Sequence, residues 1–264
     1  MRTAEPLVAS DDRELHLDMA STHAQERLLD AAFEHFATSL LPLYSGPQVT
    51  IRIGSASHEY KLPKALLCKQ SPYFAAMFEG PFKEGEEQST TLEEIHGVVT
   101  PRSFQMLVQW VCLGRVVSRE CAPDVAITTA IEFARLADMC RITGMESLMA
   151  EHIKAIILAN PLPDLEWLER PPDTNTHCLA SQHITSAVAL PEGHPVRAIL
   201  AAATVEGCLR QHNYKFEREA SRVPEFSVDL LKAARATIES ITIEYNATTF
   251  EDPISRVRLG LKRT

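Results

Sequence analysis

The amino-acid sequence predicts an α+β fold, and two kinds of signal support this. Apolar residues alternate with polar residues over positions 49–53 and again over 60–62, which is the period of a half-buried strand. A hydroxyl residue followed by proline, a typical helix start, stands at Ser71-Pro72 and at Thr100-Pro101. With 264 residues, 45% of them hydrophobic and 23% charged, the chain has the composition of a globular protein of one large domain or two small ones.

The two predicted strands form a hairpin. Val49, Ile51 and Ile53 share one face of the first strand. Residues 54–57, Gly-Ser-Ala-Ser, supply the small and turn-prone residues of a tight connection, and the alternation resumes after them.

The segment after Thr100-Pro101 has the spacing of an amphipathic helix. Apolar residues stand at i, i+3, i+4 and i+7, and a glycine fits the helix stop. These positions are Phe104, Leu107, Val108 and Val111, with Gly114 after them.

Aromatic residues in the two helices are predicted to belong to the core. Tyr73, Phe74 and Trp110 stand at helical spacing among leucines and valines. Such residues are typical of packing positions, so we do not interpret them as the lining of a ligand pocket.

The order of these segments resembles the BTB/POZ domain family. The similarity rests on K-A-L-L-x-x-x-S-P-Y-F-x-x-M-F at residues 64–78, F-x-E at 82–84 and W-x-x-x-G at 110–114. The sequence departs from the family at Leu62-Pro63-Lys64, where a histidine usually precedes the first lysine, so no role is carried over for a histidine. The resemblance implies a short β-sheet flanked by a cluster of helices, a protein-interaction fold and no active site.

Three regions are expected along the chain. The segment from 161 to 195 is rich in proline and polar residues, and apolar helical patterns follow Pro195 and Pro224. These helices are predicted to pack behind the core and not to fold without it. The regions are an N-terminal tail and helix (1–44), a BTB/POZ-like domain (45–158), and a helical extension with a basic tail (159–264).

An apolar stripe precedes the hairpin. Leu29, Phe33, Phe36 and Leu40 follow one another at steps of four, three and four residues, which places them on one helix face. The stripe packs either on its own domain or on a second copy of the chain. Because BTB-like domains often carry an N-terminal element that crosses to a second protomer, the resemblance makes a homodimer plausible, and we predict one.

Charge and cysteine usage restrict the partners and the compartment. A net charge of −9 argues against a protein that binds a phosphate backbone, so nucleic acid is not an expected partner. The six cysteines form no C-x-x-C pair, and the N-terminus lacks the apolar run of a secretory signal. The sequence contains no run of eighteen apolar residues, so no membrane span is predicted. We therefore expect an intracellular protein, in the nucleus or the cytoplasm.

The search for catalytic and metal-binding patterns favours a protein that is not an enzyme. The sequence lacks H-E-x-x-H, G-x-S-x-G and glycine-rich phosphate loops. His177, Cys178 and His183 come nearest to a metal cluster, but two further ligands at a family spacing are missing. The glutamates at 84, 86, 87, 93 and 94 are interpreted as a solvated acidic surface. No metal and no cofactor are expected.

Phe82 and Glu84 are the candidate partner-binding residues. In cullin-binding BTB domains a hydrophobic-x-Glu motif occupies the turn after the corresponding helix, and Phe82 and Glu84 match that motif. The resemblance thus implies an adaptor that recruits an unknown client to a cullin-RING ubiquitin ligase. Two alternatives stay open: Phe82 folds back onto the core, or the chain is a structural or transcription-linked scaffold with no ligase role.

Overall fold

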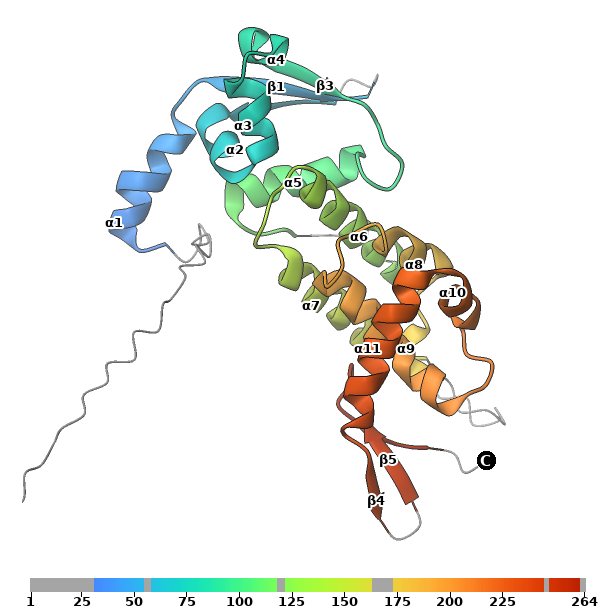
Figure 1. Ribbon diagram of the computed structural model, residues 1–264. Helices are drawn as coiled ribbons and strands as arrows, with labels where there is room; N and C mark the ends of the chain where they lie inside the picture. Colours follow the sequence, from blue (N-terminus) through green and yellow to red (C-terminus); the bar gives the residue numbers. More distant parts are fainter. Residues whose placement is uncertain (1–30, 55–57, 118–121, 163–172, 245–246, 262–264) are drawn as a thin grey trace, which may run out of the picture.

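The computed structural model describes residues 31–54, 58–117, 122–162, 173–244 and 247–261. This part of the chain is elongated (Figure 1). A short sheet and its helices form an α+β unit at one end, and an α-helical extension at the other end carries a second small sheet. The predicted α+β class with a C-terminal helical region is confirmed.

A three-stranded sheet begins the α+β unit. Its strands are β1 (Gln48–Ile53), β2 (His58–Pro63) and β3 (Ser89–Leu92). The strand order is β2-β1-β3, with β1 antiparallel to β2 and parallel to β3. Val49, Ile51 and Ile53 are fully buried, so the predicted antiparallel pairing and its core face are confirmed, while residues 55–57 of the predicted turn lie outside the described residues.

Six helices follow in the described part of this unit: α2 packs on α3 and on α5, and α6 packs on α5 and on α7. They are α2 (Lys64–Gln70), α3 (Pro72–Glu79), α4 (Lys83–Glu87), α5 (Pro101–Leu113), α6 (Pro123–Met139) and α7 (Glu146–Ala159). Phe74 and Trp110 belong to the core, as predicted. Tyr73 is a correction, because its side chain is only partly buried and lines a cavity described below.

Ser71 begins α3, as predicted, and also joins α3 to the end of α6. Its Oγ accepts a hydrogen bond from the backbone N–H of Phe74 (3.2 Å), which makes it the N-cap. The same hydroxyl donates to the backbone carbonyl of Cys140 (2.6 Å), the residue that follows α6. Since Ser71 has no exposed surface, both bonds lie in the core.

The second predicted helix start, Thr100, caps α5. Thr100 Oγ1 accepts from the Ser103 N–H (3.1 Å), and Ser103 Oγ accepts from the Thr100 N–H (3.0 Å), which is a capping box. Gly114 ends the helix at φ +65°, where the absence of a Cβ removes a steric cost. Both ends of α5 are therefore local properties of the sequence.

The N-terminal helical segment is short and irregular. It consists of α1 (Phe33–His35), the π-helical η1 (Phe36–Leu40) and the 3-10 helix η2 (Leu41–Tyr44). In the predicted stripe, Leu40 is buried, Phe36 is half-buried and Phe33 is 84% exposed, while Leu29 lies outside the described residues. The Tyr44 hydroxyl donates to the carbonyl of Cys112 (2.6 Å), which fastens this segment to α5.

The extension contains the predicted helices and a sheet that the sequence analysis missed. Its helices are η3 (Thr174–Thr176), α8 (Ser181–Ala187), α9 (Pro195–Arg210), α10 (Glu217–Arg222) and α11 (Pro224–Ile238). The strands β4 (Thr242–Glu244), β5 (Ala247–Glu251) and β6 (Arg258–Gly260) form an antiparallel sheet in the order β4-β5-β6. The β-branched residues of 242–249 were the available signal for it.

The apolar core runs without interruption from the α+β unit into the extension. α8 packs on α6, and α9 packs on α7 and α11. Inside the extension, Arg197 Nε donates to Asp229 Oδ2 (2.8 Å), and this buried ion pair joins α9 to α11. The predicted dependence of residues 160–245 on the core surface fits this packing and stays a prediction.

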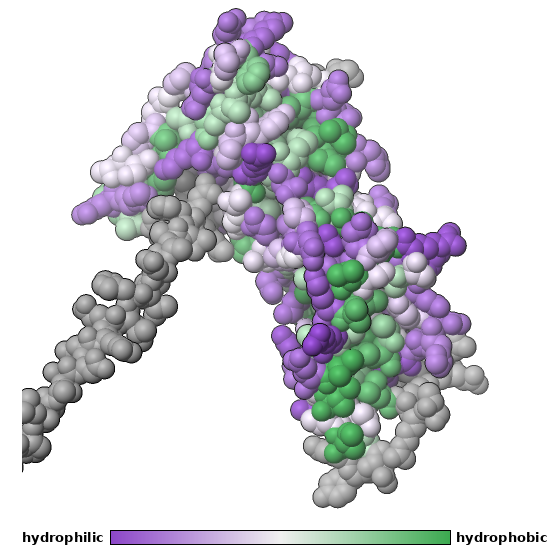
Figure 2. All heavy atoms as spheres, in the orientation of Figure 1, coloured by the Kyte–Doolittle hydropathy of each residue, from purple (hydrophilic) through white to green (hydrophobic). Residues whose placement is uncertain are grey.

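The surface of the extension exposes apolar side chains, and apolar colour runs along α11 toward the small sheet (Figure 2). Val228, Leu231 and Ile238 lie on the outer face of α11, and Ile243 of β4 follows them. Leu231 is 70% exposed. Within the described ranges, no helix has the length and apolar content needed to cross a membrane.

Candidate interaction site

A glycine-dependent turn presents Phe82. α3 ends at Glu79, and Phe82 is the N-cap of α4. A Cβ atom at Gly80 would lie 2.3 Å from the carbonyl oxygen of Ala76, so any side chain there would force the turn to open. The Gly85 N–H donates to the Phe82 carbonyl (2.9 Å) and closes the turn from the other side.

The Phe82 ring stays on the surface. It is 54% exposed, and Glu84, two residues further, is partly exposed. The alternative in which Phe82 folds back into the core is therefore not what the structure shows. The motif offers an apolar ring and a carboxylate side by side.

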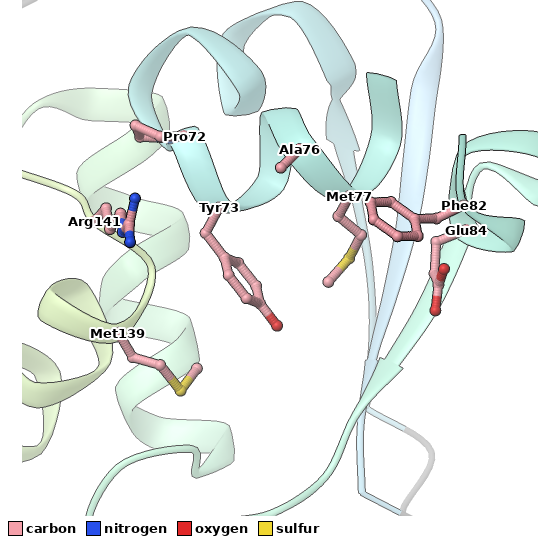
Figure 3. A pocket seen from close by; sticks show the side chains of 8 residues that line it. All are labelled: Pro72, Tyr73, Ala76, Met77, Phe82, Glu84, Met139 and Arg141. Carbon is pink, nitrogen blue, oxygen red and sulfur yellow. The ribbon is translucent and has the colours of Figure 1, made fainter. Parts of the chain in front are cut away.

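Phe82 and Glu84 form one side of an open cavity of about 550 Å³. In Figure 3, Tyr73 and Met77 project from α3 into this space, Met139 faces them from the end of α6, and Phe82 and Glu84 stand at the opposite side. The lining residues come from α3, from the turn into α4 and from the end of α6, and they are Pro72, Tyr73, Ala76, Met77, Phe82, Glu84, Met139 and Arg141.

The helical period of α3 explains why one face lines the cavity and the other belongs to the core. Phe74 and Phe78 are four residues apart and fully buried, with ring centroids 6.3 Å apart. Tyr73, Ala76 and Met77 lie on the other face of the same helix and line the cavity. The prediction that the aromatic residues of α3 belong to the core is therefore confirmed for Phe74 and wrong for Tyr73.

Met139 and Arg141 are functional candidates that the sequence analysis missed. α6 ends with hydrogen bonds from the Ile142 N–H to the Ala137 carbonyl (2.8 Å) and from the Arg141 N–H to the Asp138 carbonyl (3.0 Å). This geometry places Arg141 at φ +54°, a left-handed position that usually holds glycine. An exposed arginine there costs about 1 kcal/mol of backbone strain.

Opposite charges flank the apolar cavity. Arg141 is exposed on the α6 side, and Glu84 stands on the α4 side. Burial, followed by the nearby Cys140 thiol and Glu84 carboxylate, raises the pKa of Tyr73, so its phenol remains a hydrogen-bond donor at neutral pH. Burial also raises the pKa of Cys140 to about 12, which keeps this thiol protonated. The cavity suits a mostly apolar anchor with polar groups at both ends.

The residues that came nearest to a metal cluster in the sequence have structural contacts. His183 Nδ1 accepts from the Ala180 N–H (3.0 Å), and His183 Nε2 lies 3.1 Å from the carbonyl of Asp124 and 2.9 Å from Thr128 Oγ1. Nδ1 of His183 is thus occupied at the start of α8, and Nε2 is occupied in the contact between α8 and α6. In the part of the chain that the structure describes, no group of three or more histidine, cysteine, aspartate and glutamate side chains is placed to hold a metal ion.

A cluster of buried acidic residues in the extension was also missed by the sequence analysis. Glu206 accepts from the Thr174 N–H (3.1 Å) and from Arg210 (2.5 Å). Burial, followed by the Glu206 carboxylate, raises the pKa of Asp173 to about 7. Asp252 is also fully buried and accepts from Asn175 (2.9 Å). These bonds hold η3 against α9 and the loop after β5.

Comparison with known families places the cavity within one matched segment. A model of the BTB/POZ domain matches residues 44–156. The match begins at Tyr44, ends within α7, and includes every residue that lines the cavity.

Proposed function

Since this chain is a BTB/POZ domain-containing protein, and such domains are protein–protein interaction modules, we propose that it is a dimerising adaptor that recruits a client protein to a cullin-RING ubiquitin ligase. BTB domains are generally non-enzymatic, and the proposal assigns no catalytic role to the chain. One observation carries the ligase part: Phe82 is exposed beside Glu84 at the rim of an open apolar cavity.

The cavity defines the chemistry of the partner segment. Tyr73, Met77 and Met139 offer apolar contact, and methionine side chains adapt to different shapes. Arg141 favours a carboxylate on the partner, and Glu84 favours a donor such as an arginine or a lysine. Phe82 supplies the kind of aromatic anchor that often dominates an interface.

A cullin-binding assay tests the proposal. The full chain and purified cullin N-terminal domain are titrated by calorimetry, and Phe82→Ala is expected to weaken binding by about 2 kcal/mol, roughly thirtyfold. Glu84→Lys is expected to weaken cullin binding as well, because the substitution reverses the charge that faces the arginine or lysine of the partner. Leu231→Ala, which truncates an exposed apolar residue of α11, is the matched control and should leave the affinity unchanged. If the unaltered chain binds no cullin domain, the ligase role is wrong.

The dimer is proposed from the N-terminal segment. Phe33, a member of the predicted stripe, is 84% exposed, and Leu41, directly after the stripe, is 48% exposed. A second copy of the chain would bury both side chains in one symmetric interface. Leu40 is buried within the chain, so the proposal assigns it to intramolecular packing.

The alternative function is a BTB-type structural or transcription-linked scaffold without a ligase role. It uses the same dimer and leaves Phe82 and Glu84 without a cullin. A dimer that binds no cullin domain would favour it. We also propose an intracellular location, in the nucleus or the cytoplasm, supported by five described cysteines that are all free thiols.

A further inference from the structure

We propose that Thr91 on β3 is a phosphorylation site and that Arg52 and Lys83 hold its phosphate. The inference does not depend on cullin binding. It rests on the exposure of Thr91, on the residues that follow it, and on a second cavity beside it.

The fold selects one hydroxyl from three consecutive ones. Thr90 is buried and Ser89 is half-buried, whereas the side chain of Thr91 is exposed. Among the described strands, β3 pairs only with β1, so it is an edge of the sheet. Thr91 is therefore presented on an extended segment with one open side, as a kinase requires of its acceptor.

The residues after Thr91 indicate the class of kinase. Glu93 and Glu94 follow at the second and third positions, and both are exposed. Ser89 has Leu92 at its third position and lacks this acidic neighbour. The segment therefore fits a serine/threonine kinase whose peptide-binding site is basic. In the reaction, the terminal phosphoryl group of ATP moves to Oγ1 of Thr91, the bond to ADP breaks, and the hydroxyl proton passes to the base of the kinase.

A polar cavity of about 230 Å³ is placed to receive the phosphate. α4 lies beside β3 and β1 at this end of the molecule (Figure 1). Arg52 is directly opposite Thr91 in the parallel register of β1 and β3. The residues around the cavity are Arg52, Lys83, Glu84, Glu87, Ser89, Thr90 and Thr91.

Among the residues that the structure describes, the ion-pair partners of both cations are exposed. Arg52 pairs with Glu59 (3.1 Å) and Lys83 pairs with Glu87 (3.3 Å). Exposed ion pairs are weak, so a phosphate with a charge of about −2 competes well for both cations. Arginine binds phosphate through two parallel N–H bonds, which strengthens the contact. Glu84 and Glu87 line the same cavity and oppose the phosphate, so Arg52 and Lys83 together are required.

The site is tested first by phosphate transfer. The full chain is incubated with Mg-ATP and a purified serine/threonine kinase that requires an acidic residue three positions after the acceptor, and the phosphate is located by mass spectrometry. Incorporation at Thr91 is expected in the unaltered chain, in Ser89→Ala and in Thr90→Val, and none in Thr91→Val. Glu94→Gln should slow incorporation more than Glu93→Gln. Phosphate on another residue, or on none, would overturn the proposal.

The contacts of Arg52 and Lys83 with the phosphate are tested by the ionisation of the phosphate itself. A phosphothreonine has a second pKa of about 6, and phosphorus NMR follows it directly. Arg52→Gln and Lys83→Gln are each expected to raise this pKa in the phosphorylated chain, because each removes a positive charge. If neither variant moves the pKa, the two residues do not hold the phosphate. Lys232→Gln, which removes an exposed lysine of α11 that does not line the cavity, is the charge-matched control.

Discussion

Replacing Ser71 by alanine tests how the two walls of the cavity are held together. The Ser71 hydroxyl caps α3 through the Phe74 N–H and donates to the carbonyl of Cys140, between Met139 and Arg141. α3 forms one wall of the cavity, and the end of α6 forms the other. Ser71→Ala is therefore expected to affect stability and cullin binding together.

The size of the effect follows from two lost hydrogen bonds. Removing an N-cap costs about 1 kcal/mol. Leaving the buried Cys140 carbonyl without its donor costs a further 1–3 kcal/mol, roughly. Because Ser71 has no exposed surface, little compensation by water is expected. The free energy of unfolding should fall by about 2–4 kcal/mol in total.

Urea denaturation followed by circular dichroism measures this loss. Ser181→Ala, at an exposed serine in the first turn of α8, is the control and should change the free energy of unfolding by less than about 0.5 kcal/mol. A loss below about 1 kcal/mol in Ser71→Ala would refute the reasoning, because the cap alone would then account for it. Under conditions where the variant is folded, its affinity for the cullin domain should also be lower.

Three other outcomes are expected. Burial lowers the pKa of His183 below its ordinary 6.5, so the stability that neutral His183 contributes is present above that pH and is lost as the pH falls through the folded pKa. His183→Asn should therefore flatten the acid side of the plot of unfolding free energy against pH. An unchanged slope contradicts this. The pKa of Asp173 is raised to about 7, so the carboxyl favours folding at acid pH and opposes it as the pH rises through that value. Asp173→Asn should raise the urea midpoint at pH 8 and not at pH 4, and equal shifts at both would count against the assignment. Phe33→Glu should convert the proposed dimer to a monomer in light scattering, with Leu231→Glu as the control, and a monomer already in the unaltered chain would remove the dimer.

The elements of the α+β unit were predictable because their signals are local. Alternation over 49–53 predicted β1, and Ser71 and Thr100 marked the starts of α3 and α5. A cap or an alternating run depends on residues that are adjacent in the chain, so no knowledge of the tertiary structure was needed. The sheet of β4, β5 and β6 was missed because its strands have three to five residues, too few for a clear period.

For the candidate site, the sequence predicted fewer features and the tertiary structure decided more of them. By itself, the sequence determined Phe82 and Glu84 as candidates, because their motif lies within one turn and the resemblance marked it. Only the tertiary structure decided that Phe82 remains exposed, that Tyr73 faces a cavity while Phe74 faces the core, and that Arg141 stands across from Glu84. The physical reason is that burial and charge neighbours depend on which helices pack together, and the packing of α3 against the end of α6 joins residues that no local pattern connects.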